Sequence, residues 1–413
     1  MKDNKVNIDS LLFSITKLYP KYIDLNLSRL KKLLNKLDNP QNKLPPVIHI
    51  AGTNGKGSTL VFIKNILQEH GLKVHCYTSP HLIRFNERII LSNKQIRDDD
   101  LFETLNEVIK INNDEEITFF ELTTAVALLN FTRKKADFCL IETGLGGRLD
   151  ATNTIKKKVL NIITSIGLDH EEFLSPYLKN IVKEKCGILS KDIPVIISSQ
   201  NTNYKSHLLR KRIKDINCKI VKLKSIPKKS YLGLVGNHQK INAKTAITAV
   251  KFILKDIKNE VIQKGLKKTI WPGRMQKLSF KNNLITKSNE ILIDGAHNIE
   301  GAKIIKSHLN KLNLGKWNFI FGMMNNKNPI EFIEIIEKHI EKIIFIPIQY
   351  QKNSYQPEEL KIIFKDKKFN SMVRRNLKSA LDSVNSNKPL FITGSLYLMG
   401  EVLKIFSVKK LDF

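Results

Sequence analysis

Short apolar runs alternate along this chain with longer segments of helical periodicity. In the N-terminal half, runs rich in Val, Ile and Leu predict buried strands at residues 47–51, 74–78, 138–142, 159–166 and 195–198. Between them, apolar residues three and four positions apart predict helices at residues 58–69, 99–111, 120–134 and 176–189. Strands that alternate with helices in this way are typical of parallel α/β units.

The same alternation starts again after residue 289. It predicts strands at residues 291–293, 319–321, 343–348 and 390–393, and helices at residues 301–312, 329–339, 357–364 and 376–384. Between the two series lie a Trp-Pro-Gly-Arg turn at residues 271–274 and a polar stretch at residues 281–289. We therefore predict two α/β domains, residues 1–274 and 289–413, joined by a linker at residues 275–288.

The first predicted strand runs directly into a loop of glycines and one lysine that opens a helix. The loop consists of Gly52, Thr53, Asn54, Gly55, Lys56, Gly57 and Ser58. Glycines let the backbone approach phosphate, Lys56 supplies a cation, and free N–H groups at the helix start favour negative charge. We predict a P-loop ATPase-type N-terminal domain with a mainly parallel sheet, and a smaller Rossmann-like C-terminal domain. The alternative is a glycine-rich turn without a ligand.

Composition is ordinary for a folded protein of 413 residues, since 42% are hydrophobic and 26% are charged. Four cysteines lie far apart, without the spacing of a metal or redox pair: Cys76, Cys139, Cys186 and Cys218. The polar residues 1–9 contain no secretory leader, so we expect reduced thiols and a cytoplasmic location. No apolar run reaches the roughly 18–20 residues that span a membrane.

The net charge of +30 raises the question of a nucleic-acid partner. The lysines, however, are scattered as pairs such as Lys31 and Lys32, without an arginine-rich stripe or interleaved aromatic residues. We therefore expect no nucleic-acid partner and infer that the positive field attracts small anionic substrates. A basic nucleotide-binding or nucleic-acid-binding module without enzymatic activity remains the alternative.

Polar side chains lie at the ends of three predicted strands. Ser79 follows the second strand, Glu142 ends the third, and His170 follows the fourth. Because open α/β sheets bind ligands at the carboxyl ends of their strands, these oxygens and this nitrogen suggest a Mg²⁺ site rather than a closed zinc site. Each residue also has an ordinary structural explanation: a turn cap for Ser79, an ion pair with Arg148 for Glu142, and a core contact for His170.

Ordered motifs along nearly the whole chain resemble the Mur ligase superfamily and, within it, the folylpolyglutamate synthase and dihydrofolate synthase family. They lie at residues 52–58, 79–82, 142–153, 168–170, 184–187, 236–239 with Asn242, 271–274, 294–298 and 393–397. The run Gly-Leu-Gly-Gly-Arg-Leu-Asp-Ala-Thr-Asn at residues 144–153 resembles the signature of the folate branch. The resemblance implies a ligase that uses ATP to activate a carboxylate as an acyl phosphate, which L-glutamate then attacks.

The resemblance also implies roles for residues that match the motifs. Residues 52–58 would hold the ATP phosphates, Ser79 and Glu142 would bind one Mg²⁺, and His170 would help to hold a second. Lys185 matches a lysine that the family carries as a carbamate; its alternative is a solvated lysine on a helix face. The implied catalytic residues are Lys56, His170, Lys185 and Arg274.

Further matches concern the nucleotide, glutamate and the acceptor. Asn242, Arg274 and Asp294 match ATP contacts, whereas His297 and Ser395 match glutamate or phosphate contacts and alternatively cap helices. The dihydropteroate-binding segments correspond to Asp24, Leu25, Asn26, Leu27, Thr118, Phe119, Phe120, Glu121, Leu149, Asp150 and Ala151.

Two features of these acceptor segments leave alternatives open. Asn26 stands where bacterial bifunctional members usually have glycine, and asparagine tolerates positive φ better than most residues. Phe119 and Phe120 either stack on the pterin ring or belong to the core, and we expect the core role for one of them. The implied substrates are 7,8-dihydropteroate, reduced folates, L-glutamate and ATP, bound by a monomer. A folylpolyglutamate synthase of single specificity and another Mur-type amide ligase are the enzymatic alternatives.

Overall fold

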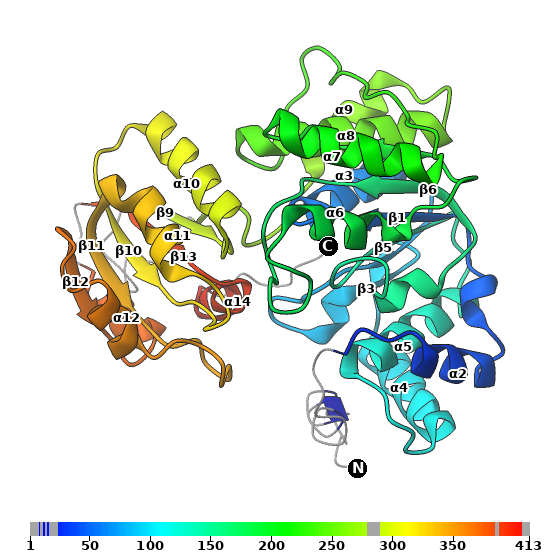
Figure 1. Cartoon of the computed structure of the whole chain (residues 1–413), viewed down its shortest axis with the longest axis horizontal. Coiled ribbons are helices and arrows are strands. Elements are labelled where there is room, and N and C mark those ends of the chain that lie inside the picture. Colours follow the sequence, from blue (N-terminus) through cyan, green and yellow to red (C-terminus); the bar gives the residue numbers. More distant parts are fainter. Residues whose placement is uncertain are drawn as a thin grey trace.

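The computed structural model describes residues 8, 11–12, 15, 24–278, 290–384 and 388–406. Figure 1 shows these residues as a larger N-terminal lobe and a smaller C-terminal lobe, each built on a sheet covered by helices. Both sheets are mostly parallel, which confirms the predicted α/β fold class. Within the described ranges, no helix has the length and apolar character needed to cross a membrane.

The N-terminal sheet has seven strands in the order β4-β3-β2-β5-β1-β6-β7. Its parallel strands are β1 (Val47–Ala51), β2 (Val74–Tyr77), β5 (Phe138–Glu142), β6 (Lys158–Ile163) and β7 (Val195–Ile197). An antiparallel hairpin of β3 (Ile89–Leu91) and β4 (Lys94–Gln95) forms one edge. All five residues of β1 are buried, as expected for a central parallel strand.

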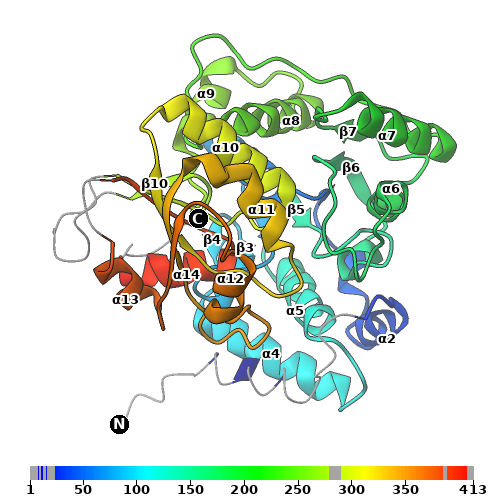
Figure 2. The ribbon, with the colours of Figure 1, turned by 60° about the vertical axis from the view of Figure 1, so that its left-hand side comes forward.

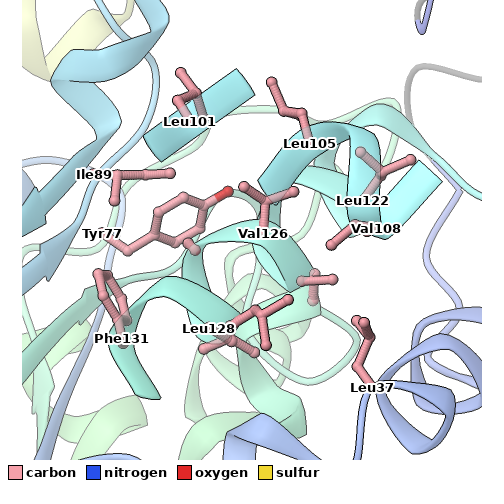
Figure 3. Close-up of a cluster of buried hydrophobic side chains, with 14 of the residues drawn as sticks. Leu37, Tyr77, Ile89, Leu101, Leu105, Val108, Leu122, Val126, Leu128 and Phe131 are labelled. Atoms are coloured by element: carbon pink, nitrogen blue, oxygen red, sulfur yellow. The ribbon is translucent and has the colours of Figure 1, made fainter. Parts of the chain in front are cut away.

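Helices cover both faces of this sheet. One face carries α2 (Ser28–Lys36), α4 (Asp98–Asn112), α5 (Phe119–Arg133), α6 (Leu178–Lys185) and α7 (Asn203–Ile216). The other carries α3 (Lys56–Glu69), α8 (Asn237–Ile253) and α9 (Asn259–Lys268). Short 3₁₀ turns are η1 (Pro40–Asn42), η2 (Phe85–Arg88), η3 (Ala151–Thr154) and η4 (Cys186–Ile188). Figure 3 shows leucines and valines of α4 and α5 around Tyr77 of β2.

The C-terminal sheet has six strands in the order β12-β11-β10-β13-β9-β8. Its parallel strands are β9 (Ile291–Asp294), β10 (Trp317–Phe321), β11 (Ile340–Phe345), β12 (Asn370–Val373) and β13 (Leu390–Thr393). One face carries α10 (Ile299–Leu312), α11 (Pro329–Ile336) with η5 (Glu337–His339), and α12 (Pro357–Ile363), and the other carries α13 (Leu377–Asp382) and α14 (Leu396–Ile405).

The chain enters the C-terminal sheet earlier than the sequence suggests. Gln276–Leu278 forms strand β8, which pairs antiparallel with β9 although it lies within the predicted linker at 275–288. Residues 279–289 lie outside the described part of the chain. The junction between the domains therefore runs from the Trp-Pro-Gly-Arg turn directly into an edge strand of the second sheet.

The two domains touch through polar and apolar contacts. In Figure 1, α14 and the start of α10 lie on the side of the C-terminal domain that faces the N-terminal domain, and Figure 2 shows the molecule turned so that the C-terminal domain comes forward. Lys205 pairs with Glu300 at 3.0 Å across this boundary. Gly400 lies so close to the Leu82 carbonyl that a Cβ would come within 1.9 Å of its oxygen. This packing brings the first turns of the C-terminal helices over the strand ends of the N-terminal sheet.

Candidate active site

The phosphate loop connects β1 to α3 in a conformation that requires glycine. Gly55 precedes the helix with φ +87°, and a Cβ there would lie 2.5 Å from Oδ1 of Asn242. Thr53 ties the loop to the segment after β6, because its N–H donates to the Ser165 carbonyl at 2.7 Å and its hydroxyl to the Gly167 carbonyl at 3.0 Å. The loop is therefore held at the carboxyl end of the sheet with its amides at the start of α3.

Two lysine side chains converge on this loop. Lys56 Nζ donates to the carbonyls of Gly52 and Thr53, both at 3.2 Å, and Lys185 Nζ donates to the Gly52 carbonyl at 2.9 Å. Lys185 is only 5% exposed, so the alternative of a solvated lysine on a helix face is wrong. Burial, and then the charge of Lys56, lower the pKa of Lys185 to about 7.

Glu142 ends β5 beside these lysines. Its Oε1 lies 3.9 Å from Lys56 Nζ, and burial raises its pKa to about 6 even though Lys56 and Arg274 oppose the shift. The suggested ion pair with Arg148 is not formed, because Arg148 pairs with Glu184 at 2.9 Å. Glu142 is therefore a buried carboxylate directed at the phosphate loop.

His170 lies on the same side of the cleft in a left-handed conformation, with φ +53°. Burial, opposed by the carboxylate of Asp169 and reinforced by nearby cations such as Lys327, lowers its pKa to about 3, so the imidazole is neutral at pH 7. Its Nδ1 is buried and has no hydrogen-bond partner among the described residues. A neutral ring nitrogen without a partner is a suitable ligand for a cation.

These residues line a single cleft of about 160 Å³ between the domains. Of the residues predicted from the sequence, it gathers Gly52, Thr53, Asn54, Gly55, Lys56, Gly57, Ser58, Ser79, Glu142, His170, Lys185, Asn242, Arg274, Asp294 and His297. A neighbouring cavity of about 290 Å³ shares Asn54, Gly55 and Asn242 with it. The structure thus places predicted phosphate, metal and nucleotide residues from both domains around one space.

The donor set fits a magnesium ion that is also held by phosphate. Ser79 and Glu142 supply oxygens, and His170 supplies the free nitrogen. The described ranges hold no group of three or more His, Cys, Asp and Glu residues placed to hold a metal by themselves. Since Mg²⁺ in nucleotide enzymes usually takes one or two protein ligands plus substrate phosphates and water, this sparse set is consistent with that ion.

The C-terminal residues have distinct surroundings. Arg274 makes no hydrogen bond with the described part of the chain, and it lies in the cleft within the electrostatic reach of Glu142 and Asp294. Asp294 accepts hydrogen bonds from the N–H groups of Met275 at 2.7 Å and Ala296 at 2.8 Å. Arg274 is therefore available to a ligand, whereas Asp294 also fixes the loop between β9 and α10.

His297 and Ser395 differ in their exposure to the cleft. His297 Nδ1 lies 2.9 Å from the Gly295 carbonyl, and its Nε2 lies 3.7 Å from Asp169 Oδ2 inside the cleft. Ser395 is 3% exposed, and its hydroxyl accepts a hydrogen bond from the Tyr397 N–H at 3.1 Å, which caps α14. The helix-cap alternative thus applies to Ser395.

Three residues that link the domains in this cleft, Asp169, Asn298 and Lys327, are not among those predicted from the sequence. Lys327 Nζ lies 2.5 Å from Asp169 Oδ1, and the Asn298 amide donates to Asp169 Oδ2 at 3.1 Å. Asn298 also bonds the Asn54 side chain at 3.2 Å. Asp169 and Asn298 lie within the quoted motifs, which was the available signal, but Lys327 follows two asparagines in an unremarkable turn.

Several side chains of the predicted acceptor segments have structural partners, and none of these residues lines the cleft. Arg29 bridges Asp24 at 2.8 Å and Glu121 at 3.3 Å, and Glu121 forms a capping box with Thr118 at the start of α5. Asn26 accepts a hydrogen bond from the Ser28 N–H at 2.7 Å and does not have positive φ. The left-handed turn considered for Asn26 is therefore absent.

The two phenylalanines occupy different positions. Phe119 packs edge-on against Phe85 with ring centroids 6.0 Å apart, and Phe120 stacks on Tyr77 at 5.9 Å. A Cβ on Gly144, which lines the cleft, would lie 2.4 Å from Phe120. Phe120 thus forms the wall directly behind the cleft.

Asp150 holds the loop that follows β5. Its carboxylate accepts hydrogen bonds from the Leu145 N–H at 2.8 Å and from the Thr152 N–H at 3.0 Å. Among the other residues of the predicted acceptor segments, Ala151 is buried, and Leu25, Leu27 and Leu149 are half-buried. Contacts of these segments with a substrate stay a prediction.

Comparison with known proteins agrees with this geometry. Residues 50–260 match the Mur ligase middle domain, and residues 276–405 match the C-terminal domain of dihydrofolate synthetase. Dihydrofolate synthetase of Saccharomyces cerevisiae is 31% identical over 419 residues, covering 93% of this chain and 98% of that protein. The chain belongs to the dihydrofolate synthase and folylpolyglutamate synthase family of Mur ligases.

Other relatives extend this assignment. Dihydrofolate synthase/folylpolyglutamate synthase of Bacillus subtilis is 31% identical, covering 92% of this chain and 94% of that protein. The structure of E. coli FolC in complex with DHPP and ADP superposes with a TM-score of 0.84 at 25% identity, covering 96% of this chain and 97% of that one. As a family member, this chain is an ATP-dependent ligase with the two-domain Mur ligase fold.

Proposed function

We propose that this protein joins L-glutamate to 7,8-dihydropteroate and to the γ-carboxylate of reduced folates, while ATP is converted to ADP and phosphate. The observation that carries this proposal is the single cleft in which Lys56, Glu142 and Lys185 face Arg274 from the domain junction. The bifunctional name of the B. subtilis relative and the ligands of E. coli FolC support the choice of substrates.

In this proposal, ATP binds across the two neighbouring cavities. Its triphosphate lies against the amides of the phosphate loop, where the start of α3 favours negative charge. Its nucleoside occupies the larger cavity, next to Asn242 and His238. Arg274 then contacts phosphate oxygens, since its planar guanidinium stays charged and binds two oxygens at once.

Ser79, Glu142 and His170 would hold magnesium, with two ions expected. The metal would neutralise the charge that builds up on the phosphates during transfer. Lys185 fits the carbamate expected from the family resemblance, because a pKa of about 7 leaves much of its amine neutral and able to add carbon dioxide. The carbamate replaces a positive charge near Lys56 with a negative one, which relieves repulsion between the two cations and provides oxygens for a metal.

The reaction has two steps. An oxygen of the acceptor carboxylate attacks the γ-phosphorus, the bond to ADP breaks, and an acyl phosphate forms. The amino nitrogen of glutamate then attacks the acyl carbon and phosphate leaves, giving the amide. Lys56 and Arg274 stabilise charge on the transferred group, and His297 helps to position glutamate beside Asp169. We also expect a cytoplasmic monomer, in keeping with four cysteines that are free in the structure.

The test is ligation by the purified protein with ATP, Mg²⁺ and L-glutamate, in parallel with dihydropteroate, with tetrahydrofolate and without an acceptor. Mass spectrometry should find at least one added glutamate on dihydropteroate and on tetrahydrofolate, with ADP released in proportion. A product from only one acceptor identifies an enzyme of single specificity. If neither acceptor gains glutamate, the proposed function is wrong, and salt-sensitive RNA binding without ligation would favour the basic binding module.

A further inference from the structure

Arg88 is a buried cation without an acidic partner in the described part of the chain. It ends η2 and is only 9% exposed. Its Nε donates to His81 Nδ1 at 2.9 Å, and its guanidinium lies over the Phe85 ring at 5.3 Å from the centroid. Neither terminal amino group has a hydrogen bond with a described residue, and none of the described carboxylates lies within ion-pair distance.

The carboxylates near Arg88 are already occupied. Glu87 accepts hydrogen bonds from three successive backbone N–H groups, those of Leu82, Ile83 and Arg84, at 2.7, 2.9 and 2.7 Å. Glu142 attracts Arg88 from a longer distance but has its closest cation in Lys56. Burial lowers the pKa of Arg88, although the guanidinium stays charged at neutral pH. Because an uncompensated buried charge destabilises a folded protein, the fold gives up stability to keep Arg88 in place.

The position of Arg88 links the two ends of the proposed acceptor site. The Phe85 ring beneath it packs on Phe119, which belongs to a segment predicted to bind the pterin ring. His81, which fixes its Nε, follows the predicted magnesium ligand Ser79 by two residues. Arg88 is therefore held by two residues, of which one contacts the predicted pterin segment and the other lies next to the predicted metal ligand in the sequence.

We propose that Arg88 binds the α-carboxylate of the terminal glutamate of folate acceptors. This inference rests on the proposed function. The two free amino groups match the two oxygens of a carboxylate in a paired geometry. A carboxylate held in this way has both oxygens engaged and is a poor nucleophile, so the partner is the carboxylate that does not react. Dihydropteroate has only the carboxylate that reacts, and Arg88 therefore distinguishes the two acceptor classes.

The test compares Arg88→Met with Arg84→Met. Arg84 is a matched control because its side chain is 55% exposed, it lies four residues away, and among the described residues its ion pair is with Asp98 at the surface. In Arg88→Met we expect the KM for tetrahydrofolate to rise about 10- to 100-fold, as for loss of a charge-assisted hydrogen-bond pair. The KM values for dihydropteroate and L-glutamate should stay within about threefold of the unmodified protein, and Arg84→Met should change none of them.

Thermal unfolding without added ligand separates binding from folding. The midpoint of Arg88→Met should equal or exceed that of the unmodified protein, because the substitution removes an unpaired buried cation. In the unmodified protein, pteroylglutamate should raise the midpoint more than pteroate, which lacks only the glutamate. This difference should disappear in Arg88→Met and persist in Arg84→Met.

Several results would overturn the inference. Equal losses with both acceptors, a higher KM for L-glutamate, an unchanged KM for tetrahydrofolate, or a lower unfolding midpoint would each assign Arg88 to another task. An enzyme that uses dihydropteroate alone would also overturn it, since no acceptor would carry a second carboxylate. If neither acceptor is ligated, the proposed function fails, and the comparison of pteroylglutamate with pteroate still decides whether Arg88 recognises the carboxylate.

Discussion

Replacing Lys185 with methionine removes a buried ammonium group that lies near the ammonium group of Lys56. The pKa of Lys185 falls from 10.5 to about 7, first because the side chain is buried and then because Lys56 lies close. A difference of roughly 3.5 pH units corresponds to about 5 kcal/mol of unfavourable free energy when both the folded and the unfolded chain carry the charge. Lys185→Met removes this unfavourable free energy, but it also removes the hydrogen bond to the Gly52 carbonyl, which lowers the stabilisation by about 1 kcal/mol.

The sign of the pH dependence follows from proton binding. Between about pH 7 and pH 10.5 the unfolded chain binds a proton at Lys185 that the folded chain does not, so the unmodified protein becomes more stable as pH rises through this window. Below pH 7 Lys185 is charged in both states, and the folded protein bears the full free-energy cost of burying that charge. Lys185→Met should therefore be more stable by a few kcal/mol at about pH 6, and this advantage should vanish towards pH 10.

The assay is urea unfolding of both proteins at several pH values in buffer free of carbon dioxide. Taking the difference between the two proteins cancels other shifted groups, such as Lys158 with its pKa lowered by burial to about 7. A variant that is less stable at acidic pH, or a difference that does not change with pH, would refute the argument. Added bicarbonate should stabilise only the unmodified protein, since carboxylation of Lys185 turns repulsion by Lys56 into attraction.

Four further substitutions, arranged as two pairs of a test and its control, examine the phosphate loop and the packing of a glycine. Lys56→Ala should lower the rate of ADP release at least about 100-fold, because it removes a cation from the phosphates. In Cys186→Ala the rate should stay within about threefold of the unmodified protein, since Cys186 is buried and does not line the cleft. Near-normal turnover of Lys56→Ala would contradict the assignment of the phosphate loop. Gly187→Ala should cost more than about 2 kcal/mol in urea unfolding, because its Cβ would lie 2.3 Å from that of Arg148. Gly71→Ala, with φ +89° but no atom within 4 Å, should cost about 1 kcal/mol, and an equal cost for both would contradict the packing argument.

Much of the fold is predictable because buried parallel strands are short apolar runs. The predicted strands at 47–51 and 138–142 coincide with β1 and β5. Helix α8 is not predicted, since Thr245, Ile247 and Thr248 disfavour helices in isolation and the element depends on packing against α3. The β3–β4 hairpin is too short for a two-residue period to stand out, with three and two residues in its strands.

The site is predictable to the extent that neighbouring strand ends define it. Ser79, Glu142 and His170 could be grouped because parallel strands end at one edge of the sheet. The ion pair of Lys327 with Asp169 could not, since 158 positions separate the two residues and only the arrangement of the domains brings them together. The burial of Lys185 is equally hidden, because residues 183–185 alternate charges as a solvated helix face does.

The convergence of Lys56 and Lys185 on the Gly52 carbonyl makes nucleotide binding an exchange of partners. Two of the three N–H groups of Lys56 already donate to the carbonyls of Gly52 and Thr53, so a phosphate that takes either of these N–H groups displaces a neutral acceptor. The net gain is only the difference between a charged and an uncharged acceptor. Weakly charged anions gain little from such an exchange and polyphosphates gain much, so the loop discriminates by charge before any base or sugar is recognised.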